Sequence, residues 1–204
     1  MKSDETTTVA AERAAEVSAT MARVRDVIAT EGVTRSSLER VKQALLALAA
    51  RRELFPDTAF PPPSGAGEIE TLFGISEDPN GDFALYVYRP GPGKRTPPHN
   101  HATWAVVVGI EGEEPTTLWQ REDRDGKAYV TATKHVRIGP GEGMCYLPED
   151  IHSIAIDGAT AIKHLHLYGH TLLDLPDRLD FDPCVGGARH PEGKPVVLRP
   201  LDLD

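Results

Sequence analysis

The amino-acid sequence predicts a mainly β protein, an antiparallel β-sandwich or barrel with an α-helical extension at its N-terminus. Three observations predict this fold class. The first sixty residues carry apolar side chains at helical spacing, and about a hundred residues that follow divide into short β-rich segments. Turn signals separate these segments, with no helical pattern between them. The 204 residues are enough for one ordinary domain with a full core.

The N-terminal extension, residues 1–60, is expected to form two antiparallel helices that pack on the outside of the barrel. Gly32 supplies a stop between them, and Thr34 is a suitable N-cap for the second helix. Pro56 and the three prolines at 61–63 then break the helical pattern and form a linker. The two apolar stripes that define the helices consist of Val17, Met21, Val24 and Ile28, and of Leu38, Val41, Leu45 and Leu48.

Residues 61–182 are predicted to form the barrel and to carry its metal site. Turns rich in Gly, Pro, Asn and Asp divide this region into short strands, which favours an antiparallel barrel. Residues 183–204 are rich in Gly, Pro and Arg and are expected to wrap over the barrel surface. The candidate strands cover residues 69–75, 83–89, 102–110, 115–121, 128–136, 143–148, 152–157 and 161–168.

Three histidines indicate a metal site. His99 and His101 alternate, which places both imidazoles on one face of an extended chain. His152, on a distant predicted strand, would close a cap of three nitrogen ligands. The competing interpretation of the His-x-His pair alone is two surface histidines on a strand.

The glycine pattern around these histidines resembles the two conserved blocks of cupin barrels. Gly112 follows the His-x-His pair, and residues 139–143 and Pro148 precede His152. Cupins normally carry a glutamate four or five residues after the second histidine, where this chain has Ala105 and Val106. The predicted cap is therefore neutral, which favours an anionic, chelating substrate. Imidazole suits iron, copper, nickel and zinc alike.

A second constellation follows on the last predicted strand. Strict alternation places His164, His166, Tyr168 and His170 on one face. An unpaired polar group costs about 1–3 kcal/mol when buried, so these groups need partners if the face looks into the barrel. One interpretation is an edge strand with a wet face. The other is a relay in which His166 orients the Tyr168 hydroxyl beside the metal.

Together, His99-Asn100-His101, His152 and the segment 165–168 resemble the cysteine dioxygenase family of thiol dioxygenases, a branch of the cupins. The resemblance covers roughly residues 68–180. It implies a mononuclear Fe(II) held by His99, His101 and His152, with a Ser-His-Tyr relay beside it. The implied reaction oxidises a small thiol carboxylate to a sulfinic acid with both atoms of O₂.

Several positions depart from the animal-type enzymes of that family. Val106 stands where those enzymes have a cysteine crosslinked to the tyrosine, and neither Cys145 nor Cys184 lies in an equivalent place, so we expect no crosslink to Tyr168. His164 replaces the serine of the relay. The arginine that binds the substrate carboxylate is absent, because its expected position falls near Phe73.

Arg178, ten residues after Tyr168, is the candidate that replaces this arginine. Its position resembles that of the arginine in bacterial 3-mercaptopropionate dioxygenases, and a guanidinium fits a carboxylate with two parallel donors. The alternative is a surface arginine paired with Asp174 or Asp180. Arg89 and Arg95 are weaker candidates for the same role. Trp104 is expected in the barrel core rather than in the pocket wall.

Composition excludes several partners. The net charge of −9 argues against nucleic acid and against an anionic membrane surface. No uncharged run approaches the length of a membrane span, and the start of the chain has no signal-peptide pattern. Two cysteines fit a reducing compartment, so a cytoplasmic location is expected, and no oligomeric state is predicted.

The sequence therefore predicts an Fe(II)-dependent thiol dioxygenase acting on a small thiol carboxylate, 3-mercaptopropionate-like or cysteine, with O₂. Two alternatives stay open. One is another metal-dependent cupin enzyme, a diketone oxygenase, isomerase or lyase, for which zinc or nickel would be the expected ion. The other is a non-catalytic cupin that binds a small anion.

Overall fold

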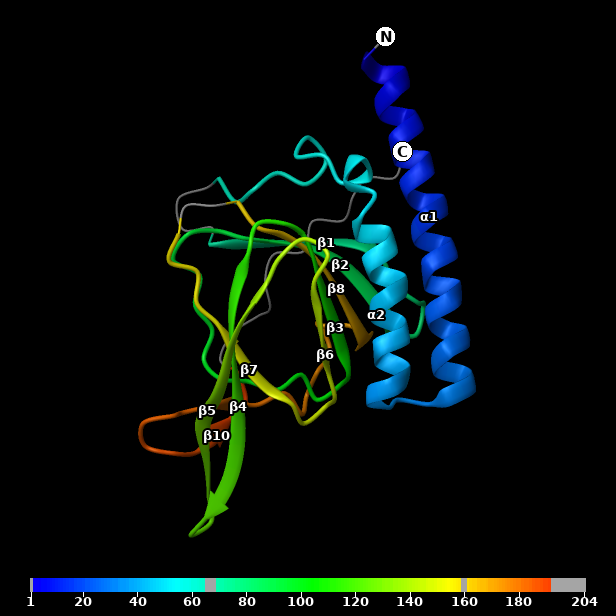
Figure 1. The fold of residues 1–204 in the computed structure, drawn as a ribbon. Helices are drawn as coiled ribbons and strands as arrows, with labels where there is room; N and C mark the ends of the chain where they lie inside the picture. The colour runs from blue at the N-terminus through cyan, green and yellow to red at the C-terminus, as the bar shows by residue number, and fades with distance from the viewer. Residues whose placement is uncertain (1, 65–68, 159–160, 192–204) are drawn as a thin grey trace.

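The computed structural model describes residues 2–64, 69–158 and 161–191, and places two antiparallel sheets face to face with two helices outside them (Figure 1). The predicted mainly β antiparallel barrel with an N-terminal helical extension is confirmed. The elements are α1 (Lys2–Glu31), α2 (Arg35–Ala49), the short 3-10 helix η1 (Arg52–Leu54), β1 (Glu70–Ser76), β2 (Asp82–Pro90), β3 (Ala105–Glu111), β4 (Glu114–Arg124), β5 (Lys127–Ile138), β6 (Gly143–Tyr146), β7 (Ile151–Ile154), β8 (Lys163–His170), β9 (Asp180–Phe181) and β10 (Ala188–Arg189).

The two helices form where the apolar stripes predict them. Gly32 ends the first helix with a positive φ of 66°, which glycine adopts without a steric penalty. Thr34 caps the second helix: its side chain accepts a hydrogen bond from the Ser37 amide, and the Ser37 side chain accepts one from the Thr34 amide. Leu38 and Leu45 are fully buried. Both stripes pack into one core with the outer face of the larger sheet.

The larger sheet has the strand order β1-β2-β8-β3-β6, so β8 lies at its centre. Because side chains alternate along a strand, the two faces of β8 differ completely. Leu165 and Leu167 point toward the helices and join their core. His164, His166 and Tyr168 occupy the opposite face, inside the barrel. The interpretation of this segment as a wet edge strand is therefore wrong.

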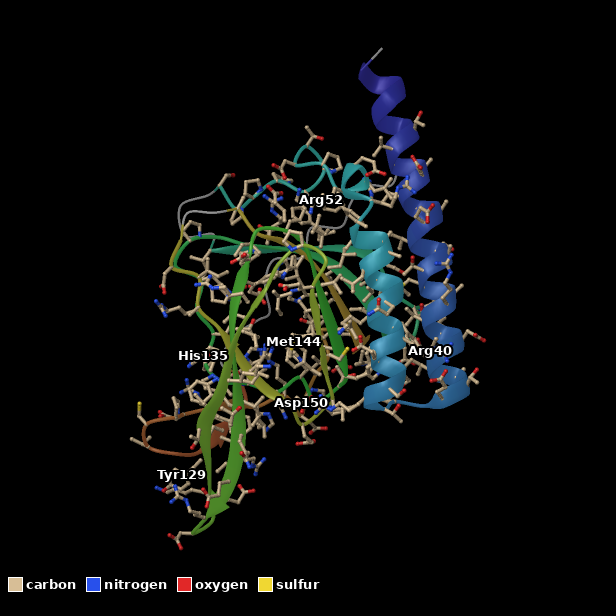
Figure 2. The ribbon with its side chains drawn as sticks, viewed as in Figure 1. Arg40, Arg52, Tyr129, His135, Met144 and Asp150 are labelled. Carbon is tan, nitrogen blue, oxygen red and sulfur yellow. The ribbon has the colours of Figure 1, made fainter. Side chains whose placement is uncertain are left out.

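The smaller sheet has the order β5-β4-β7 and closes the barrel on the side away from the helices. Strands distant in sequence pair in a nested way, β3 with β8 and β4 with β7, which is a jelly-roll arrangement. The β4–β5 hairpin extends well beyond the barrel (Figure 1). Side chains of Tyr129 and His135 on β5 lie on this side of the molecule, far from α1 and α2 (Figure 2).

All eight predicted strands are present, with ends that differ from the prediction by up to three residues. The strand expected at 102–110 begins at Ala105, and the strand expected at 152–157 covers Ile151–Ile154. At the start of the predicted tail, β10 pairs with β9, and Gly187 donates a backbone hydrogen bond to the Ala128 carbonyl of β5. The part of that tail beyond residue 191 lies outside the described residues.

Candidate metal centre

The three histidines predicted as ligands converge inside the barrel. The backbones of His99 and His152 exchange two hydrogen bonds, His99 N to His152 O at 2.9 Å and His152 N to His99 O at 3.0 Å. His101 reaches the same point, with its Nε2 atom 3.2 Å from Nε2 of His152. All three side chains are buried. The interpretation of the His-x-His pair as surface histidines is therefore wrong.

The His-x-His segment is not a regular strand, although alternation predicted one. Ala102 has a positive φ of 56°, which interrupts the extended chain before β3. Between the two histidines, the Asn100 side chain contacts Leu179. Its Oδ1 atom accepts a hydrogen bond from the Leu179 backbone amide at 2.8 Å, and the Asn100 backbone amide donates to the Leu179 carbonyl. These two hydrogen bonds fix the segment to the chain that follows β8. His99 and His101 therefore keep their side chains on one side, although the segment is not part of a continuous strand.

The geometry of the trio fits a shared metal ion. Ligand bonds of about 2.0–2.1 Å at an angle of about 100° place two nitrogen atoms about 3.2 Å apart, which matches His101 and His152. The Pro97 carbonyl lies 2.9 Å from Nδ1 of His99, so Nδ1 donates to it and Nε2 keeps its lone pair. The potential ligand atoms of the three residues lie within 4.8 Å of one another, and the group contains no carboxylate.

Burial keeps these imidazoles neutral. Burial, together with the neighbouring Arg178, lowers the pKa of His152 to about 3. Burial, with smaller contributions from the neighbouring histidines and Arg178, also lowers the pKa of His99 and of His101 well below the usual value. Neutral imidazole is the form that binds a metal ion.

A small cavity opens in front of the trio. Its volume of about 110 Å³ is well below the range of about 300–1,000 Å³ that holds drug-sized ligands, so it suits a molecule of a few heavy atoms. The lining residues are Glu70, Leu72, Tyr88, Lys94, Thr96, His99, His101, Glu114, His152, Ile154, His166, Tyr168, Leu172 and Arg178.

Tyr168 and His166 lie together in the wall of this cavity. Nδ1 of His166 and the Tyr168 hydroxyl are 3.0 Å apart, and the Tyr168 ring lies 5.2 Å from the His101 ring, centroid to centroid. Burial raises the pKa of Tyr168 above its usual range, so the phenol stays protonated. Burial also lowers the pKa of His166. The pair can therefore supply one hydrogen-bond donor beside the metal ligands.

The remaining members of the alternating face lie elsewhere. His164 is fully buried and does not line the cavity, and Glu114 Oε2 lies 3.9 Å from its Nδ1 atom. His170 is at the end of β8, one third exposed, with its Nδ1 atom 3.3 Å from Asp82 Oδ1. Trp104 packs in the helix-side core against Phe83, on the opposite face of the larger sheet from Tyr168.

Among the three candidate arginines, Arg178 lines the cavity. Its Nη2 atom lies 3.9 Å from Asp180 Oδ1, and its Nε atom is buried with no partner among the described residues. Arg89 is buried elsewhere and donates to Asp57 at 2.7 Å, and Arg95 is exposed and paired with Asp157. Both interpretations of Arg178 therefore hold in part: the side chain lines the cavity, and Asp180 is its acidic neighbour.

Five polar residues of the cavity were not predicted from the sequence: Glu70, Tyr88, Lys94, Thr96 and Glu114. Lys94 forms a 2.5 Å ion pair with Glu70, and the Tyr88 hydroxyl donates to the same carboxylate at 2.6 Å. Glu114 is the first residue of β4, and burial raises its pKa to about 7. The strand was predicted to begin at residue 115, which left Glu114 outside it. Because the observed β4 begins at Glu114, the side chains of Glu114 and Thr116 point to the same inner face.

The two cysteines lie away from Tyr168. The thiol of Cys145 on β6 donates to the Leu38 carbonyl at 3.3 Å, on the helix side of the larger sheet. Cys184 is exposed near β10. Val106 pairs with Cys145 and Leu167 and shares that outer face. A crosslink to Tyr168 has no cysteine within reach among the described residues.

Comparison with known proteins shows similarity at the level of the fold. No family model matches the sequence, and no curated protein matches it. The polyketide cyclase RemF from Streptomyces resistomycificus is 19% identical, with a TM-score of 0.42 over 55% of this chain and 71% of that one. The cupin domain of an XRE-family transcriptional regulator from Enterobacter cloacae is 16% identical, with a TM-score of 0.37 over 50% and 98%. The DMSP lyase DddQ from Ruegeria pomeroyi is 16% identical, with a TM-score of 0.40 over 57% and 55%.

Among the described residues, neither helix combines the length and apolar character that a membrane-crossing helix needs.

Proposed function

We propose that this protein is a thiol dioxygenase. The reaction joins a thiolate and O₂ to give a sulfinate, so that both oxygen atoms end on sulfur and no further oxidant or reductant is consumed. The substrate is a small thiol carboxylate, 3-mercaptopropionate-like or cysteine. One observation carries the proposal: three buried imidazoles, without a carboxylate among them, converge in a small cavity that also contains an arginine and a His-Tyr pair.

The neutral ligand set defines the kind of substrate that is favoured. The ligand set contributes no negative charge, because it consists of the neutral imidazoles of His99, His101 and His152. A divalent ion bound by these three residues would keep its full charge and attract an anion. His99, His101 and His152 would hold Fe(II), which would supply the activation of O₂ for its reaction with a thiolate. The cavity limits the substrate to a few heavy atoms.

Arg178 provides the second anchor for such a substrate. Its guanidinium faces the cavity and has an unpartnered buried Nε atom, so it can donate to a carboxylate. Asp180 is too far for a direct hydrogen bond at 3.9 Å and leaves these donors available. Two anchors, metal and guanidinium, would hold the thiol and the carboxylate at a set separation.

Tyr168 would position the reactants through its phenolic proton. For the Tyr168 hydroxyl to donate into the cavity, the hydrogen bond between the two side chains must run from His166 Nδ1–H to the phenolic oxygen. That requirement selects the tautomer of His166 with its proton on Nδ1 and leaves Nε2 with a free lone pair. Tyr168 then directs its own proton to the substrate or to oxygen.

Oxygen uptake by the iron-loaded protein tests the proposal. 3-Mercaptopropionate, cysteine and a small diketone are offered separately, and sulfinate is quantified by mass spectrometry. We expect uptake with a thiol and sulfinate in equal amount. Uptake with the diketone alone would favour a different cupin oxygenase, and no uptake with any of them would favour an isomerase, a lyase or an anion-binding protein.

A ligand variant links this activity to the trio. His152→Ala should abolish thiol oxidation and the iron bound by the trio, because two imidazoles hold a ferrous ion poorly. His135→Ala is the matched control, since His135 is an exposed histidine on β5 (Figure 2). An iron content in His152→Ala equal to that of the unaltered protein would remove His152 from the ligand set.

A further inference from the structure

A second cluster of metal-ligating side chains lies beside the histidine trio. Glu114 on β4 and His164 and His166 on β8 bring one carboxylate oxygen and two imidazole nitrogens within 4.8 Å of one another. All three residues are at least nine-tenths buried, with exposed fractions of 2%, 0% and 7%. The cluster shares no residue with the His99 trio.

Several polar atoms of this cluster lack a partner, although Glu114 Oε1 accepts from Thr116 and His166 Nδ1 lies beside the Tyr168 hydroxyl. Glu114 Oε2, Nε2 of His166 and a ring nitrogen of His164 are buried without a hydrogen bond among the described residues, while the Ile138 backbone lies within reach of the His164 ring. The 3.9 Å between Glu114 and His164 is too long for a hydrogen bond. Buried polar groups are nearly always partnered, so three unpartnered ligand atoms that face one another indicate a missing ligand.

A shared cation would satisfy the ligand atoms of all three residues at once. A carboxylate and two imidazoles form the two-histidine, one-carboxylate set that binds first-row divalent metals, whereas calcium and magnesium prefer oxygen ligands. Glu114 and His166 also line the cavity, which gives an ion a path to the cluster. His164 and His166 are two residues apart on the central strand of the larger sheet, which holds their side chains on one face.

We infer that Glu114, His164 and His166 form a second binding site for a divalent transition-metal ion, separate from the site of His99, His101 and His152. In the proposed reaction this ion has a defined role. A metal on Nε2 of His166 leaves the proton on Nδ1, where it donates to the Tyr168 oxygen 3.0 Å away. The second ion therefore positions Tyr168 through His166.

Metal stoichiometry tests the second site directly. The chain is stripped with a chelator, saturated with zinc, desalted and analysed for zinc by mass spectrometry. We expect about two ions per chain for the unaltered protein and about one for each of Glu114→Gln, His164→Gln and His152→Ala. Glu114→Gln with His152→Ala should retain about none, and His135→Gln, an exposed-histidine control, about two.

Two results would overturn the inference: one zinc per chain in the unaltered protein, or an unchanged count in both Glu114→Gln and His164→Gln. A crystal of the unaltered protein soaked in zinc adds a measurement that needs no variant. Anomalous scattering should place one zinc among Glu114, His164 and His166, and its absence there would count equally against the site. Loss of thiol oxidation does not enter this test, so a failure of the proposed function remains distinguishable.

Discussion

Two basic side chains face the cavity, and their surroundings give them different roles. Lys94 is tied to Glu70 at 2.5 Å, and the same carboxylate also accepts from Tyr88. Arg178 has only a distant acidic neighbour in Asp180, and its Nε atom has no partner among the described residues. Arg178 is therefore the side chain with donors available for an incoming carboxylate.

Arg178→Ala should weaken the use of carboxylated thiols selectively. A hydrogen bond to a charged group contributes about 1.5–3 kcal/mol, which corresponds to a loss of about 10- to 100-fold in kcat/KM. The same variant should change kcat/KM for a thiol without a carboxylate by less than about threefold, because that substrate never meets the guanidinium. Steady-state oxygen uptake measures both values.

Arg95→Ala is the matched control, because Arg95 is exposed and paired with Asp157 away from the cavity. Its kinetic constants should equal those of the unaltered protein. Equal losses for the two thiols in Arg178→Ala would contradict a carboxylate-binding role and would assign the residue to the support of the histidine trio.

At the scale of residues, the sequence predicts ligands better than it predicts their surroundings. His99, His101 and His152 are recognisable because their residue type and order carry the metal chemistry, and the structure brings them together. Glu114 belongs to no such pattern. Its place beside His164 depends on where β4 begins and on how the two sheets face each other. A predicted strand start that is wrong by one residue is enough to miss it.

At the scale of elements, the two faces of β8 have different roles. Leu165 and Leu167 join the helices in one core, whereas the polar face of the strand serves the cavity. Residues of α2 such as Leu45 should therefore contribute to stability without affecting the metal ligands. This separation can be tested with a substitution confined to the outer face.

Leu45→Ala should lower the free energy of unfolding by about 2–5 kcal/mol, because it removes a fully buried side chain from the core between α2 and the larger sheet. Leu46→Ala, a substitution of the same kind at a partly buried position of the same helix, should cost less. Urea unfolding measures both. Zinc stoichiometry should be unchanged in either variant, and a loss of zinc in Leu45→Ala would contradict the separation.

The elements themselves follow from local signals, and their ends follow less well. The capped helix at Thr34 and the turn around Gly126, with φ of 74°, are specified by residues inside the turn or cap. The start of β3 is different, because Asn100 exchanges hydrogen bonds with Leu179, almost eighty residues away. A contact between such distant segments leaves no periodic trace in the sequence.

At the scale of the whole molecule, the barrel encloses five buried histidines that stay neutral. Burial lowers the pKa of each of five imidazoles below the usual value of 6.5, to about 3 for His152 and for His164. Protonation of any of them in the folded state is costly, because a buried cation without a partner is poorly solvated. The five residues are His99, His101, His152, His164 and His166.

The metal-free protein should consequently lose stability in mild acid. Below about pH 6.5 the unfolded chain binds protons that the folded chain excludes, so the free energy of unfolding falls with falling pH, by about 1 kcal/mol per histidine and pH unit. Glu114, with a pKa raised to about 7, acts in the opposite direction between about pH 4.5 and 7, but as one group against five.

Thermal unfolding of chelator-treated protein should give a clearly lower Tm at about pH 5.5 than at about pH 7.5. His164→Gln should reduce this difference and His135→Gln, which removes an exposed imidazole, should preserve it. Equal Tm values at the two pH values would mean that these imidazoles reach water in the folded state.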